Sequence, residues 1–135
     1  MLVNNFLKFI IRYSVQLYVG WVFLIALLTL LPGSVIPNIS WDFISIDKTA
    51  HIIMFTGLAF IALVSSSYGK LKIFGNKPKL MSILTAVLYG YTLELMQSFI
   101  PQRSYDFADF TADCVGTVVG YGLFLGMLNI LPNKK

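Results

Sequence analysis

Hydrophobic residues are concentrated in four long runs, separated by short stretches that contain polar residues, proline and glycine. The runs are Tyr13–Leu31, Thr49–Tyr68, Leu80–Ile100 and Phe107–Leu131. An α-helix needs roughly 20 apolar residues to cross the hydrocarbon core of a bilayer, and each run is close to that length. Membrane-spanning strands alternate apolar and polar positions, whereas these runs are continuously apolar. The pattern therefore predicts an all-α protein built as a bundle of four transmembrane helices.

The composition excludes an ordinary soluble domain. The chain has 135 residues, of which 57% are hydrophobic and 12% are charged. Four spans and their connectors account for nearly all of this length, so residues 1–135 are expected to form a single integral membrane domain. Cys114 is the only cysteine, which excludes an intramolecular disulfide, and we interpret it as a small packing residue.

The distribution of basic residues predicts the orientation in the membrane. Eight of the ten lie in the N-terminal segment, the second connector and the C-terminus: Lys8, Arg12, Lys70, Lys72, Lys77, Lys79, Lys134 and Lys135. Cytoplasmic segments of membrane proteins are enriched in Lys and Arg, so both termini are predicted to be cytoplasmic. The net charge of +4 is thereby explained without nucleic acid. The first run is too long for a signal peptide and is interpreted as a retained span.

Five of the six acidic residues and the only histidine fall into two clusters beside or inside the apolar runs. The first cluster is Asp47, Lys48 and His51, and the second is Glu94, Gln97, Arg103, Asp106, Asp109 and Asp113. An ionisable side chain at the centre of a spanning helix costs about 2.5–3.5 kcal/mol even on lenient scales. These nine residues are therefore the candidate ligand-binding residues.

Helical spacing places the members of each cluster on shared faces. Asp47 and His51 are four residues apart on the second helix, and Glu94 and Gln97 are three apart on the third. Asp109, Asp113, Gly116 and Gly120 follow one another at 4–3–4 spacing on the fourth. Glu94 and Asp113 each lie roughly 10 Å from their helix end. The polar groups are therefore expected to meet in one layer in the outer part of the bilayer, with Arg103 as their main counter-charge.

Most of these residues also have a purely structural interpretation. Asp47 and Asp106 could cap helices, and Lys48 could extend toward the lipid headgroups. Arg103 could contact lipid phosphate non-specifically, and His51 could be a hydrogen-bonded structural residue. Gly116 and Gly120 are typical of close helix packing. Glu94 and Asp113 are harder to explain structurally, because a buried carboxylate must be paired, bound to a metal or protonated.

The two outer connectors resemble each other. Residues 34–43 read Ser-Val-Ile-Pro-Asn-Ile-Ser-Trp-Asp-Phe and residues 98–107 read Ser-Phe-Ile-Pro-Gln-Arg-Ser-Tyr-Asp-Phe, with six of ten positions identical. Shortly after each copy comes an Asp-x-Thr-Ala sequence, which begins at Asp47 and at Asp109. In this alignment His51 corresponds to Asp113. The chain is thus predicted to be a duplicated helical hairpin, although a chance match remains the alternative.

The arrangement of these residues resembles the VanZ-like family. An Asp-Lys-x-x-His-x-x-x-Phe pattern is followed by Glu-x-x-Gln-x-x-x-Pro-x-Arg-x-x-Asp-x-x-Asp and a Gly-x-x-x-Gly helix. The residues that carry the resemblance are Asp47, Lys48, His51, Phe55, Glu94, Gln97, Pro101, Arg103, Asp106, Asp109, Gly116 and Gly120. The resemblance implies a small multi-pass protein of the bacterial cytoplasmic membrane, in a family whose namesake is linked to resistance to the glycopeptide antibiotic teicoplanin. Asp113 departs from the family pattern, where Asn is expected more often.

Three functions fit this reading, and the first is favoured. The chain binds a membrane lipid or an amphiphilic, lipid-linked anionic ligand in an outward-facing polar pocket, with Arg103, Lys48 and His51 as anion partners. Alternatively, the carboxylates and His51 hold a metal that hydrolyses a lipid phosphate or amide. In the third reading the polar groups only hold the bundle together. No nucleic-acid partner is expected, and the sequence leaves the catalytic residues, metal, cofactor and oligomeric state open.

Overall fold

The computed structural model describes residues 2–32, 46–68 and 75–130. Four α-helices follow one another: α1 (Leu2–Thr29), α2 (Ile46–Ser67), α3 (Pro78–Gln97) and α4 (Phe107–Ile130). The described residues contain no strand, so the predicted all-α four-helix architecture is confirmed. The first connector copy of the predicted repeat, residues 34–43, lies outside the described residues, and the duplication stays a prediction.

The first helix begins earlier than the hydrophobic pattern predicted. It starts at Leu2 rather than Tyr13, and Lys8 and Arg12 are part of it. No proline or glycine interrupts the chain before Gly20, and charged residues such as Lys and Arg are good helix formers. The boundary of the apolar run is therefore not the boundary of the helix.

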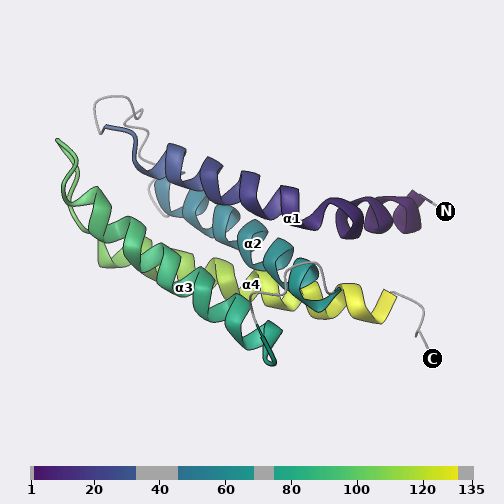
Figure 1. Ribbon diagram of the computed structural model, residues 1–135. Coiled ribbons are helices and arrows are strands. Elements are labelled where there is room, and N and C mark those ends of the chain that lie inside the picture. The colour runs from purple at the N-terminus through teal and green to yellow at the C-terminus, as the bar shows by residue number, and fades with distance from the viewer. Residues whose placement is uncertain (1, 33–45, 69–74, 131–135) are drawn as a thin grey trace.

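Consecutive helices run antiparallel, so α2 and α4 run in the same direction, and α2 contacts all three other helices (Figure 1). The start of α1 and the end of α4 lie at one end of the bundle. The start of α2, the end of α3 and the start of α4 lie at the opposite end. The segments that carry the two polar clusters are therefore brought to the same end of the molecule.

Glycines allow α4 to approach α2 closely. A Cβ atom added at Gly116 would lie 2.5 Å from the carbonyl oxygen of Ile52, and one at Gly120 would lie 2.5 Å from that of Thr56. The Thr56 hydroxyl donates a hydrogen bond of 3.1 Å to the carbonyl of Gly116. The interpretation of Gly116 and Gly120 as a packing face is confirmed, since any larger residue would separate the two backbones.

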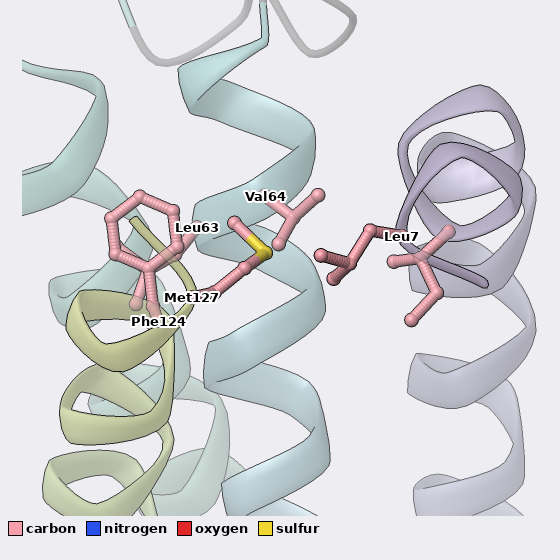
Figure 2. Packing of buried hydrophobic residues seen from close by; sticks show 6 residues of the cluster. Leu7, Leu63, Val64, Phe124 and Met127 are labelled. Carbon is pink, nitrogen blue, oxygen red and sulfur yellow. The ribbon is translucent and has the colours of Figure 1, made fainter. Parts of the chain in front are cut away.

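An apolar cluster holds the helices together at the end away from the polar residues. Leu63 and Val64 of α2 lie between Phe124 and Met127 of α4 on one side and Leu7 of α1 on the other (Figure 2). A second cluster continues the core toward the polar end and consists of Ile25, Phe55, Leu58, Ala86 and Leu93.

Three of the four helices are long and apolar enough to cross a membrane: Asn5–Thr29, Ile46–Ser67 and Phe107–Ile130. Large apolar side chains such as Phe23 and Val118 are exposed on their outer surfaces, as lipid contact requires. Helix α3 is less apolar because it carries residues such as Lys79, Thr92 and Glu94. The prediction of membrane-spanning helices is confirmed for three runs, and for α3 it stays a prediction.

Candidate functional site

Three helices each contribute one buried ionisable residue to a single point. His51 of α2 is 2% exposed, Glu94 of α3 is 0% and Asp113 of α4 is 1%. One imidazole nitrogen and one oxygen from each carboxyl group all lie within 4.8 Å of one another. His51 and Asp113 are 62 residues apart in the sequence, and their contact brings the two clusters into one site.

His51 and Asp113 form the innermost contact between two ionisable side chains. The Nδ1 atom of His51 lies 2.8 Å from Oδ1 of Asp113. The other oxygen, Oδ2, is buried and has no hydrogen-bond partner among the described residues. It lies against Gly90 of α3, where an added Cβ atom would be only 2.7 Å away. Gly90 therefore makes room for the Asp113 carboxylate.

Glu94 is the most isolated of the buried acids. Its Oε2 accepts a hydrogen bond of 3.3 Å from the backbone N–H of Asp106. Its Oε1 is buried and has no hydrogen-bond partner within residues 2–32, 46–68 and 75–130. A buried, unpaired polar group is costly, so this oxygen needs a partner that the described part of the protein does not provide.

Lys48 neutralises the outer acids of the site. Its ammonium lies 3.0 Å from Oδ2 of Asp106 and 2.8 Å from Oδ1 of Asp109. The first turn of α2 is thereby tied to the first turn of α4. Lys48 is thus bonded inward to two carboxylates, which corrects the interpretation that it only extends to the lipid headgroups.

Asp106 combines a capping role with this ion pair. Its Oδ1 accepts a hydrogen bond of 2.8 Å from the backbone N–H of Ala108, so the predicted cap of α4 is confirmed. Both the Ala108 N–H and the Lys48 ammonium stabilise the ionised form, and they hold the pKa of Asp106 below its ordinary value. The same side chain therefore starts the helix and orients Lys48.

Asp47 and Gln97 occupy the edges of the site. Asp47 lies in the first turn of α2, half-buried, with a carboxylate oxygen within 4.8 Å of ligand atoms of His51 and Asp109. A carboxylate in this position is also favoured by the helix dipole. The Gln97 amide donates a hydrogen bond of 2.8 Å to the carbonyl of Thr29, so its donor is directed to the end of α1.

Arg103 lies in the turn between α3 and α4 and is half-buried. Gln102, just before it, has a positive φ of 63°. The Nε atom of Arg103 is buried and has no hydrogen-bond partner in the described part of the chain. Arg103 was expected to be the main counter-charge of the acids, but the ion pairs between described residues go to Lys48 and His51 instead.

Two contributors were not identified from the sequence. Thr29 receives the Gln97 amide, and Gly90 contacts the Asp113 carboxylate. Gly90 did leave a signal, because it precedes Glu94 by four residues and Gln97 by seven and so shares their helix face.

Chemically, this site is a set of buried oxygen and nitrogen ligands below a turn that carries an arginine.

A family model described as VanZ/LLP1 matches residues 3–130, which is nearly the whole chain. No curated protein and no solved structure is significantly similar to the chain.

Proposed function

Because the chain belongs to the VanZ/LLP1 family of membrane proteins, we propose that it binds the anionic head of an amphiphilic or lipid-linked ligand at this site. In this proposal the protein resides in a bacterial cytoplasmic membrane, with both termini in the cytoplasm and the site opening to the outer leaflet. The resemblance to a family associated with teicoplanin resistance makes an acylated glycopeptide one candidate ligand, and a lipid-linked phosphate the other.

The observation that carries the proposal is the buried Nε of Arg103, which has no hydrogen-bond partner within residues 2–32, 46–68 and 75–130. Lys48 and His51 are already paired with acids of the site, whereas Arg103 has no ion pair with another described residue. Leaving a buried donor unsatisfied costs about 1–3 kcal/mol, and more when the donor is charged. A guanidinium also matches the oxygens of a phosphate or carboxylate in a planar, two-pronged arrangement. An anionic head group would therefore be bound at a donor that the described residues leave unused.

The surroundings of the site suit a ligand with a hydrocarbon chain. Phe99 is 86% exposed and Phe107 is also largely exposed, and both flank the turn that carries Arg103. These side chains offer an apolar path from the polar site to the lipid. The charged head group would bind in the polar site, and the hydrocarbon chain would lie along the apolar surface of α3 or α4.

Hydrolysis of a lipid phosphate or amide is the second candidate function, and the buried His51–Asp113 pair favours it. A carboxylate that holds an imidazole by one nitrogen orients the ring for proton transfer through the other. Release of inorganic phosphate or of a free acyl chain by the purified protein would distinguish this function from binding alone.

The test of the binding proposal uses farnesyl phosphate as the probe, titrated into the purified full chain in lipid nanodiscs. The wild-type protein should bind farnesyl phosphate and not farnesol, which lacks the anionic head. Arg103→Ala should weaken binding at least about 10-fold, equivalent to about 1.4 kcal/mol. The matched control is Lys77→Ala, which removes an exposed base at the other end of the bundle. Equal affinity of wild type and Arg103→Ala for both farnesyl phosphate and teicoplanin would refute the proposal.

A further inference from the structure

We propose that His51, Glu94 and Asp113 bind a divalent transition-metal ion between α2, α3 and α4. The inference goes beyond ligand binding and does not depend on it, because it rests on the positions and the unpaired oxygens of these three side chains. One nitrogen and two oxygen ligands from three different helices is a donor set that suits Zn²⁺ or Mn²⁺.

The spacing of the three ligand groups fits a single ion. A metal with ligand distances of about 2.1 Å holds its ligand atoms roughly 3.0–4.2 Å apart. The potential ligand atoms of His51, Glu94 and Asp113 lie within 4.8 Å of one another. The group is therefore close to the span that one ion requires.

The two carboxylates each keep an unused oxygen for the ion. Glu94 Oε1 and Asp113 Oδ2 are buried and lack a hydrogen-bond partner among the described residues. They belong to residues that are 0% and 1% exposed, so bulk water cannot readily donate hydrogen bonds to them. Two unsatisfied oxygens in one buried cluster are explained by a cation that binds both.

The remaining ligand, His51, presents its Nδ1 atom to the same point. This atom lies 2.8 Å from Oδ1 of Asp113, close to the separation that two ligand atoms keep on one ion. A neutral His51 that binds the metal through Nδ1 carries its proton on Nε2. The cation then takes the place of the proton that the imidazole and the carboxylate otherwise share.

A second group of possible metal ligands, formed by Asp47, His51 and Asp109, overlaps the first at His51. The charges around the two groups favour the one that contains Glu94. Asp109 is already bonded to the Lys48 ammonium at 2.8 Å, and a positive neighbour opposes a second cation. Glu94 has no basic ion-pair partner among the described residues. Two carboxylates and a neutral imidazole carry a charge of −2, which a divalent ion cancels.

Three protein ligands leave at least one coordination position open, as in other functional metal sites. An anionic head group could therefore contact the ion as well as Arg103. The cation would also explain how a site rich in carboxylates tolerates an anion.

The test is the uptake of metal alone by the full chain in nanodiscs after chelator treatment. Wild type should bind one Zn²⁺ or Mn²⁺ per chain, and bound metal should raise its thermal unfolding midpoint. Glu94→Gln and His51→Gln should each weaken binding at least about 10-fold, because each removes a ligand. Thr92→Val is the matched control on α3, because Thr92 is exposed and only two residues from Glu94. It should bind metal like wild type.

A second measurement guards against misfolded variants. Mn²⁺ bound to wild type should show a nitrogen coupling in pulsed electron paramagnetic resonance, because His51 would be a ligand. Wild type that takes up no metal saturably, or an Mn²⁺ signal without nitrogen coupling, would overturn the proposal. Loss of uptake in Asp47→Asn but not in Glu94→Gln would place the ion in the other group and would also overturn it. Arg103→Ala should lose the anionic probe and keep the metal, so failure of one proposal is distinguishable from failure of the other.

Discussion

Replacement of Lys48 by Met should destabilise the protein by leaving two carboxylates without their shared cation. The side chains of Lys48, Asp106 and Asp109 are 33%, 46% and 5% exposed, so the two ion pairs differ in solvent access. The pair with Asp106 is solvent-accessible and contributes about 0.5 kcal/mol. Loss of one partner from a fully buried pair costs about 3–5 kcal/mol, and the partial exposure of Lys48 reduces that cost for Asp109. We expect the free energy of unfolding to fall by about 2 kcal/mol, between these limits.

The assay is reversible unfolding in mixed micelles, followed by circular dichroism, for a double-mutant cycle. Lys48→Met/Asp109→Asn should be more stable than Lys48→Met alone, with a coupling of at least about 1 kcal/mol between the two sites. Lys77→Met, an exposed lysine at the other end of the bundle, is the control and should change stability little. A loss below about 0.5 kcal/mol in Lys48→Met, or no relief from Asp109→Asn, would show that the ion pairs do not hold α2 to α4.

Three further predictions test packing, protonation and topology. Gly116→Ala should lower the free energy of unfolding by about 1–3 kcal/mol, because the added Cβ would overlap α2. Gly122→Ala, where an added Cβ has nothing within 4 Å, is the control and should not destabilise the protein. Equal effects of the two substitutions would argue against the close contact. The lowered pKa of Asp106 means that its ionised form stabilises the fold above its ordinary pKa and that this contribution is lost as the pH falls through its folded-state pKa. The stability difference between wild type and Asp106→Asn should therefore shrink as the pH falls from 6 toward 3, and a growing difference would contradict the assignment. In a background without the native cysteine, a cysteine at Gln102 should react with an impermeant thiol reagent on intact cells and one at Asn76 should not, while the reverse labelling would invert the proposed orientation.

Helical periodicity was sufficient to predict that the ionisable residues of α2, α3 and α4 lie close together. Asp47 and His51 on one helix, Glu94 on the next and Asp109 and Asp113 on the last were each assigned a face and a depth. A face that carries ionisable groups must turn away from lipid, so the faces could only converge on one another. For this reason the site could be predicted although its members are far apart in the sequence.

Periodicity could not predict which acid pairs with which base. Arg103 was expected to neutralise the carboxylates, but Lys48 bonds to Asp106 and Asp109, and His51 bonds to Asp113. The pairing depends on distances between helices, which the close approach at Gly116 sets. The early start of α1 was missed for a different reason, because hydropathy reports lipid contact and not the length of a helix.

An experimental structure with farnesyl phosphate bound, obtained in the presence of Zn²⁺, tests the central claim most directly. The account predicts phosphate oxygens at hydrogen-bond distance, about 2.7–3.2 Å, from the Arg103 guanidinium. It also predicts the hydrocarbon chain along the outer surface of α3 or α4 and a metal peak between His51, Glu94 and Asp113. The account would be contradicted if the phosphate lay among the lipid headgroups away from Arg103 while the polar side chains bonded only to one another. These residues would then have a purely structural role.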